Sequence, residues 1–189
     1  MSAPLSPSVT KGRLLVASPS LDDPNFERSV VFMIEHSDEG ALGLVLNRPS
    51  GIELLGPLPE WSRLATEPSV VFVGGPVSQG SAIALARLDR DGPVSGFEPV
   101  LGRLGVIDLG EDPDLIGGPV DDLRVFTGYA GWGSAQLEAE LDQGAWWVVD
   151  AQPGDAFSDD PDTLWRRVLR RQRPPLNRFA LYPPDPSLN

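Results

Sequence analysis

The chain has 189 residues, a length typical of one domain, and its hydrophobic fraction of 41% and charged fraction of 22% are those of a globular protein. It contains no cysteine, which excludes disulfides and thiolate chemistry and fits a reducing cytoplasm. Its formal net charge of −12 repels nucleic-acid phosphates and anionic membranes, so direct DNA binding is disfavoured unless a local basic patch overrides it. No apolar run approaches the ~20 residues that span a bilayer, and we expect no membrane association.

The two ends of the chain are predicted to be irregular. Residues 1–10 carry prolines and serines without the basic and apolar regions of a signal peptide. Three prolines interrupt the last seven residues. We therefore expect a single domain over 1–189, with an ordered core over about 12–173, flexible termini and a cytoplasmic location.

The first elements predicted are strands. The apolar run 13–18 predicts a short buried strand, and turn residues fill 20–26. Segment 29–35 is rich in β-branched and aromatic residues, and segment 41–47 follows a tight turn, so the two predict an antiparallel hairpin.

Proline and glycine interrupt residues 48–68, which predicts a loop with one helical turn. Further strands are expected over 70–73 and 104–109. Segment 81–88 fits a strand or a helix, and its shortness after a glycine turn favours a strand.

Segment 123–127 predicts a strand that leads into the glycine-rich residues 128–133. A helix is expected next, with Ser134 as its N-cap and Gly144 as its stop, and then a strand over 146–150.

The last predicted helix begins with Asp160 as N-cap and Pro161 in its first turn, and it ends before Pro174 and Pro175. Four apolar residues share one of its faces: Leu164, Trp165, Val168 and Leu169. The sequence thus predicts an α+β domain with mixed, mostly antiparallel β-structure and a few helices.

Several motifs, in order over roughly residues 12–170, resemble those of the AlgH/YqgE family. The matching segments are Gly12–Ala17, Pro19, Leu21, Asp23-Pro24, Phe26, Ser29–Val31, Glu35-His36, Gly40-Ala41, Gly43, Asn47–Pro49, Gly74–Pro76, Gly128-Tyr129, Trp132, Gln136–Glu138, Glu140, Trp146 and Trp165. The resemblance implies a barrel-like, bifurcated sheet flanked by helices. The family is bacterial and carries a historical label of transcriptional regulator, without an agreed activity or catalytic residue set.

Three glycine- and proline-rich segments each follow a predicted strand: 47–49, 74–76 and 128–133. If these strand ends lie together, they form a hollow for a small ligand or peptide, with an anion favoured by Arg48 and by the following helix N-terminus. Its candidate ligand-binding residues are Asn47, Arg48, Gly74, Gly75, Tyr129 and Trp132. The alternative is that the glycines allow tight turns and the aromatic residues plug the end of the barrel.

His36 is the only histidine and could act as a general base near neutral pH. Adjacent strand residues point to opposite faces, so Glu35 is poorly placed to orient it, and the alternative is a structural hydrogen bond at the hairpin.

A metal site is not expected. One histidine without cysteine cannot form the usual zinc site. The carboxylates of Asp155, Asp159, Asp160 and Asp162 could hold Ca²⁺ or Mg²⁺, but they lack the EF-hand spacing, and helix capping explains them more simply.

Catalytic motifs are missing from the sequence. It lacks the G-x-S-x-G, G-x-x-x-x-G-K-[ST] and G-x-G-x-x-G patterns, so we assign no catalytic residue and expect no cofactor.

Five arginines lie within residues 165–173, mostly away from the apolar face of the last helix. They could dock RNA phosphates or an acidic protein patch. The alternative is a solvated face whose charges suit the negative end of the helix.

Two function classes stay open. The first is a non-catalytic binding or regulatory module acting through protein contacts, with a link to gene expression implied by the resemblance. The second is an enzyme of unknown reaction, or a small-anion binder, using the hollow at Arg48, Gly75 and Tyr129. The sequence names neither a partner protein nor a small ligand.

Overall fold

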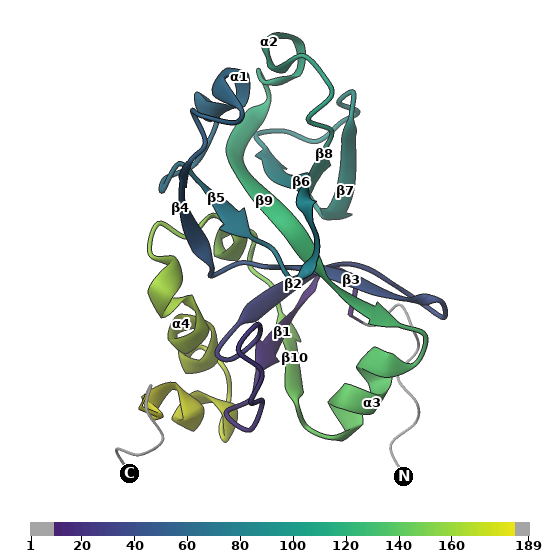
Figure 1. Cartoon of the computed structure of the whole chain (residues 1–189), viewed down its shortest axis with the longest axis vertical. Helices are drawn as coiled ribbons and strands as arrows, with labels where there is room; N and C mark the ends of the chain where they lie inside the picture. Colours follow the sequence, from purple (N-terminus) through teal and green to yellow (C-terminus); the bar gives the residue numbers. More distant parts are fainter. Residues whose placement is uncertain (1–9, 184–189) are drawn as a thin grey trace.

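The computed structural model describes residues 10–183, so most of both predicted irregular ends lies outside the described residues. Within this range, ten strands form one strongly curved sheet (Figure 1). The strands are β1 (Arg13–Ala17), β2 (Val30–Ser37), β3 (Gly40–Val45), β4 (Pro49–Glu53), β5 (Val70–Val73), β6 (Val77–Leu88), β7 (Phe97–Leu101), β8 (Leu104–Ile107), β9 (Val120–Gly133) and β10 (Trp146–Asp150).

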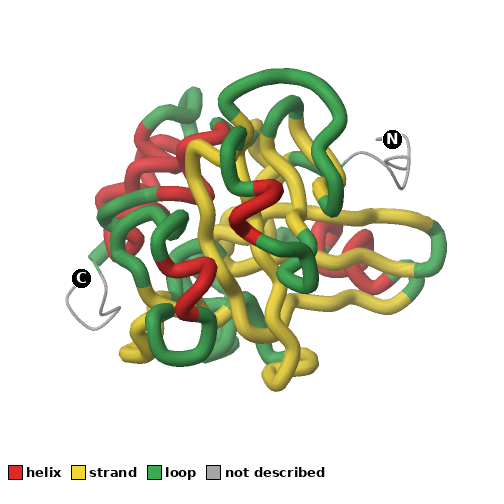
Figure 2. Tube along the Cα trace, turned by 90° about the horizontal axis from the view of Figure 1, so that it is seen from above, coloured by secondary structure: helices red, strands yellow, loops and turns green. Residues whose placement is uncertain are grey.

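Short helices flank this sheet on more than one side (Figure 2). The α-helices are α1 (Pro59–Ser62), α2 (Pro113–Ile116), α3 (Gln136–Asp142) and α4 (Leu164–Arg170), and the 3₁₀ segments are η2 (Pro153–Phe157), η3 (Pro161–Thr163) and η4 (Leu176–Leu181). The fold is therefore the predicted α+β class, an antiparallel half-barrel with a few helices.

Strand β9 joins the two halves of the sheet. The strand order is β10-β1-β2-β3-β9-β6-β8-β7, and β5 adds a parallel pairing to β9 while it also pairs with β4. The C-terminal half of β9 pairs with β3, whereas its N-terminal half pairs with β5 and β6 (Figure 1). The sheet therefore splits along β9, as the family resemblance implies.

Glycines let the backbones cross where the sheet splits. Gly74 and Gly75 follow β5 and pass directly over β9. A Cβ atom on Gly75 would lie 2.2 Å from the carbonyl carbon of Tyr129, and one on Gly128 would lie 2.4 Å from the carbonyl oxygen of Gly75. Gly128 also has a φ of +67°, which favours glycine. The crossing has no room for side chains on these residues.

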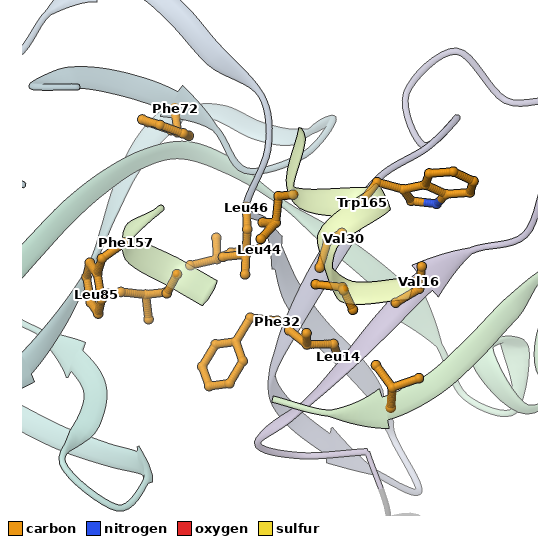
Figure 3. Close-up of a cluster of buried hydrophobic side chains, with 14 of the residues drawn as sticks. Leu14, Val16, Val30, Phe32, Leu44, Leu46, Phe72, Leu85, Phe157 and Trp165 are labelled. Carbon is orange, nitrogen blue, oxygen red and sulfur yellow. The ribbon is translucent and has the colours of Figure 1, made fainter. Parts of the chain in front are cut away.

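Both faces of the β1–β3 layer are covered, which explains its nearly continuous apolar runs. Alternate side chains point to opposite faces. Leu14 and Phe32 belong to the cluster that includes α4, whereas Leu15 and Val31 belong to the cluster that includes Leu137 of α3. Figure 3 shows the first cluster, with Trp165 of α4 among its members.

The apolar face predicted for the last helix is confirmed, because Leu164, Trp165, Val168 and Leu169 are all buried. Its predicted start is wrong in detail. The 3₁₀ segment η3 follows Asp160, and the Asp160 carboxylate accepts a hydrogen bond from the Thr163 hydroxyl instead of a backbone N–H.

The predicted hairpin of β2 and β3 and the strands over 13–17, 70–73, 104–107 and 146–150 are present, and segment 81–88 is a strand. Two other predictions are wrong. Residues 48–68 contain β4 besides the helical turn α1, and residues 128–133 continue β9 instead of ending a strand. Residues 130–133 stay extended because they pair with β3, which lies about 90 residues earlier in the chain.

Ser134 is not the N-cap of α3. Its hydroxyl donates a hydrogen bond to the carbonyl oxygen of Asp38, at 2.8 Å, in the β2–β3 turn. Ala135 occupies the cap position with a φ of +60° and without a side-chain hydrogen bond. Ser134 therefore ties the hairpin tip to the end of β9.

A buried arginine that the sequence does not single out fastens the segment after β10. Arg124 of β9 is 1% exposed, and its guanidinium lies 4.3 Å from the Phe72 ring centroid. It donates hydrogen bonds to the carbonyl oxygens of Ala156, Ser158 and Glu67, at 3.1, 2.9 and 2.8 Å. Burial lowers the pKa of Arg124 to about 10, so the side chain is charged at neutral pH.

Candidate functional site

A shallow hollow of about 480 Å³ lies on the sheet where β2, β3 and β9 run side by side. Its centre is a row of cross-strand partners, in which Glu35 pairs with Leu42 and Leu42 pairs with Gly131. Tyr129 and Val77 extend this row, since they pair across β9 and β6. We call these five residues, together with Glu39 at the hairpin turn, the hairpin hollow.

The floor of the hairpin hollow is apolar. A Cβ atom on Gly131 would lie 3.2 Å from Cε2 of Tyr129 and 3.7 Å from Cγ2 of Val77, so both side chains lie beside this glycine. Val77 is 37% exposed, and Tyr129 and Leu42 are half-buried. An apolar side chain of a ligand could therefore contact all three.

The charged groups of the hairpin hollow are negative. Glu35 and Glu39 line it, and both are exposed. The Lys11 ammonium donates a hydrogen bond to Glu35, at 3.0 Å, and this bond is the main cause that lowers the pKa of Glu35. Because two carboxylates line the hollow, one of them paired with Lys11, a cationic group fits this lining better than the expected anion.

Tyr129 and Trp132 were expected to form two walls of one site. They lie three positions apart on β9, so their side chains leave opposite faces of the strand. Trp132 borders the hollow, but its indole is buried against α3 and donates to Glu140 at 2.8 Å. The two aromatic residues therefore do not face each other across one site, and the half-buried Tyr129 ring lines the hairpin hollow.

Asn47 and Arg48 were expected in the same hollow, and the structure places them elsewhere. The buried Asn47 side chain accepts a hydrogen bond from the Val30 amide at 3.0 Å and donates one to the Arg28 carbonyl at 2.9 Å. Arg48 donates to the Glu27 carbonyl, and burial is the main cause that lowers its pKa. Both residues hold the segment before β2.

Gly74 and Gly75 likewise form the backbone crossing and not a ligand contact. The Gly74 amide donates to the Thr127 carbonyl at 2.9 Å, and the Gly74 carbonyl accepts from the Val45 amide at 2.8 Å. The interpretation that these glycines allow close turns therefore describes them better.

His36 lies on the opposite face of β2 from Glu35, as strand alternation predicts. Its Nε2 lies 3.0 Å from Oε1 of Glu138, and its Nδ1 lies 2.7 Å from Oγ1 of Thr10. Glu138 was missed as its partner, since it lies 102 residues away. His36 is 6% exposed and Thr10 is 1% exposed, so this chain of contacts is closed to a substrate and serves to fasten β2 to α3.

Glu140 of α3 links two tryptophans through hydrogen bonds that the sequence did not predict. Its Oε2 accepts hydrogen bonds from the indole N–H groups of Trp132 and Trp146, both at 2.8 Å. Its Oε1 accepts from the Gln136 amide at 3.1 Å, and Phe26 packs against both indoles. This network fixes α3 against the face of the sheet opposite the hairpin hollow.

We expect Glu140→Gln to lower the free energy of unfolding by about 2 kcal/mol. Both carboxylate oxygens of Glu140 accept hydrogen bonds, and glutamine replaces one of them by an NH₂ group, which would face an N–H donor instead of accepting from it. The measurement is urea unfolding followed by tryptophan fluorescence. Asp142→Asn is the control, because Asp142 is exposed on the same helix and should change stability by less than about 0.5 kcal/mol. Equal effects of the two substitutions would contradict the structural role of Glu140.

Two of the four candidate metal carboxylates, those of Asp155 and Asp160, accept hydrogen bonds from other side chains. Both oxygens of Asp155 accept hydrogen bonds from Arg171, each at 2.6 Å. Within residues 10–183, no group of three or more His, Cys, Asp or Glu residues is arranged to hold a metal ion. No helix in the same range is long and apolar enough to cross a membrane.

The split sheet, the glycine crossing and the docked α3 define an α+β half-barrel seen in solved structures. A crystal structure of a protein from Corynebacterium diphtheriae superposes with a TM-score of 0.88 and 31% identity, covering 96% of this chain and 95% of that one. The solution structure of the AlgH protein from Pseudomonas aeruginosa gives a TM-score of 0.63 and 32% identity over 86% of each chain.

Sequence comparison places the chain in the same group. The AlgH-like family model matches residues 14–177. A UPF0301 protein of Streptomyces avermitilis is 50% identical over 193 residues, covering 100% of both chains, and one of Mycobacterium marinum is 45% identical over 190 residues, covering 99% of this chain and 94% of that one. The chain belongs to the AlgH-like family, and the resemblance in its motifs is confirmed.

Proposed function

We propose that the chain is a non-catalytic binding module that acts through protein contacts. In this proposal, the hairpin hollow takes a short partner segment with an apolar side chain next to a lysine or arginine. The observation that carries it is the apolar floor of Leu42, Val77 and Tyr129 beside the carboxylates of Glu35 and Glu39. Such a surface is complementary to an apolar group with an adjacent cation.

The position of His36 favours binding over catalysis. It is the only histidine of the chain, and its side chain lies on the face of β2 opposite the hairpin hollow. It therefore cannot serve as a general base for a group bound in the hollow.

The proposal places the protein in the cytoplasm, which agrees with the lack of cysteine. A role in gene expression would then run through a partner protein, since the acidic chain as a whole repels DNA.

The test uses fluorescein-labelled hexapeptides at 0.15 M salt, read by fluorescence anisotropy. A peptide of alternating leucine and arginine is expected to bind, whereas leucine–glutamate and serine–arginine peptides are expected to bind at least about tenfold more weakly. Val77→Ser should weaken the first peptide about fivefold, because it removes part of the apolar floor.

Leu115→Ser is the matched control, because Leu115 is 81% exposed on α2 and does not line the hollow. Equal effects of Val77→Ser and Leu115→Ser would contradict the proposal. Equal binding of the serine–arginine peptide would show attraction by net charge alone and would also overturn it.

A further inference from the structure

The C-terminal segment carries a charge opposite to that of the rest of the chain. Residues 164–181 contain six of the 15 basic residues and none of the 27 acidic ones, so this segment has a charge of +6 and the remainder −18. The segment comprises α4 and η4, which pack together at one side of the molecule (Figure 1). Screening limits the repulsion from distant acids to about 8 Å at physiological salt, so the segment can attract an anion locally.

Three arginines of this segment are available for a ligand. Arg170, Arg173 and Arg178 are exposed, and none of their guanidinium groups makes a hydrogen bond or ion pair with the part of the chain that the structure describes. Arg170 also lies one helical turn from Arg166, where like charges repel. Guanidinium groups bind phosphate oxygens through paired hydrogen bonds, so these three side chains fit phosphates.

An aromatic row that runs through Phe179 of η4 ends in an exposed ring. Trp147 packs against Phe179 with ring centroids 4.7 Å apart, and Phe179 packs against Tyr182 at 5.3 Å. Tyr182 is 43% exposed. Its carbonyl oxygen accepts hydrogen bonds from both Arg28 and Arg166, at 3.1 and 3.2 Å, which fixes the backbone that carries the ring.

We propose that this face binds a short segment of single-stranded nucleic acid. Phosphates contact Arg170, Arg173 and Arg178, and one unpaired base stacks on Tyr182. Positive groups combined with an aromatic platform are the features by which proteins hold single strands. A duplex has no unpaired base for the ring, and its length would bring further phosphates to the acidic remainder of the chain. An acidic peptide would use the arginines but not the ring.

The test measures the anisotropy of a labelled eight-nucleotide oligouridylate between 0.05 and 0.3 M salt. Three phosphate contacts to a single strand predict a slope of about −2 for log K against log salt. Replacing Arg170, Arg173 and Arg178 together by glutamine should abolish this slope. The binding constant at 0.1 M salt should then fall about 100-fold. Tyr182→Ala should weaken binding about tenfold, and the control Leu181→Ala should not.

The charge control replaces Arg63, Arg90 and Arg103 by glutamine, which changes the net charge equally but outside the segment, and it should retain binding. Oligothymidylate of equal length shows whether a single strand without 2′-hydroxyl groups also binds; binding of either single strand supports the proposal. Equal loss in the charge control, tighter binding of an octaglutamate peptide, or no binding of either strand at 0.05 M salt would overturn it.

Discussion

Replacing Gly128 by alanine is expected to lower the free energy of unfolding by about 4 kcal/mol. Two costs add at this position. The φ of +67° is unfavourable for alanine by about 1 kcal/mol, and the new methyl group would lie 2.4 Å from the Gly75 carbonyl oxygen and 2.9 Å from that of Val77. Because both neighbours are backbone atoms at the point where the sheet splits, the crossing cannot move aside without separating its strands.

Gly102→Ala separates these two costs. Gly102 has a φ of +56°, but no atom lies within 4 Å of the position of its Cβ. We therefore expect it to lose only about 1 kcal/mol in the same urea unfolding experiment. If Gly128→Ala costs no more than Gly102→Ala, the crossing is not as close as the structure shows.

Replacing Arg124 by methionine is expected to lower the free energy of unfolding by about 4 kcal/mol. The substitution keeps much of the buried apolar stem but removes the guanidinium that three backbone carbonyls share. Those carbonyl oxygens then lose their charged donor inside the protein, which is costly. Urea unfolding followed by far-ultraviolet circular dichroism measures the loss.

Arg103→Met is the control for Arg124, because Arg103 is exposed and its guanidinium donates to a single carbonyl, that of Asp89. It should lower the stability by less than about 1 kcal/mol. A small loss for Arg124→Met would mean that the segment after β10 is held chiefly by its apolar contacts.

The sequence predicted those elements that depend on residues close together in the chain. The hairpin of β2 and β3 followed from two β-rich runs around a tight turn, and the apolar face of α4 followed from helical spacing. The strand β4 was missed because proline and glycine are typical of loops and because its five residues are largely exposed. Its pairing with β5 makes it a strand.

The candidate site depends on contacts between residues that are far apart in the sequence, and local sequence patterns do not predict such contacts. The glycines of 128–133 looked like a strand end, yet distant pairing keeps them extended in β9. Glu138 and Glu140 belong to recognised motifs, but their partners His36 and Trp132 became visible only in the fold. Tyr129 lines the hairpin hollow, which is not the hollow predicted at Arg48 and Gly75, and the glutamates that set its charge were not foreseen.

The most direct test of the binding-module proposal is a ¹⁵N–¹H NMR titration of the full chain with the leucine–arginine hexapeptide at 0.15 M salt. We expect saturable shifts of the backbone amides of Glu35, Gly40, Leu42, Tyr129 and Gly131, and unchanged signals from α2 and α4. Shifts that stay outside these residues, or no saturable shift at millimolar peptide, would contradict the assignment of the hairpin hollow as the binding site.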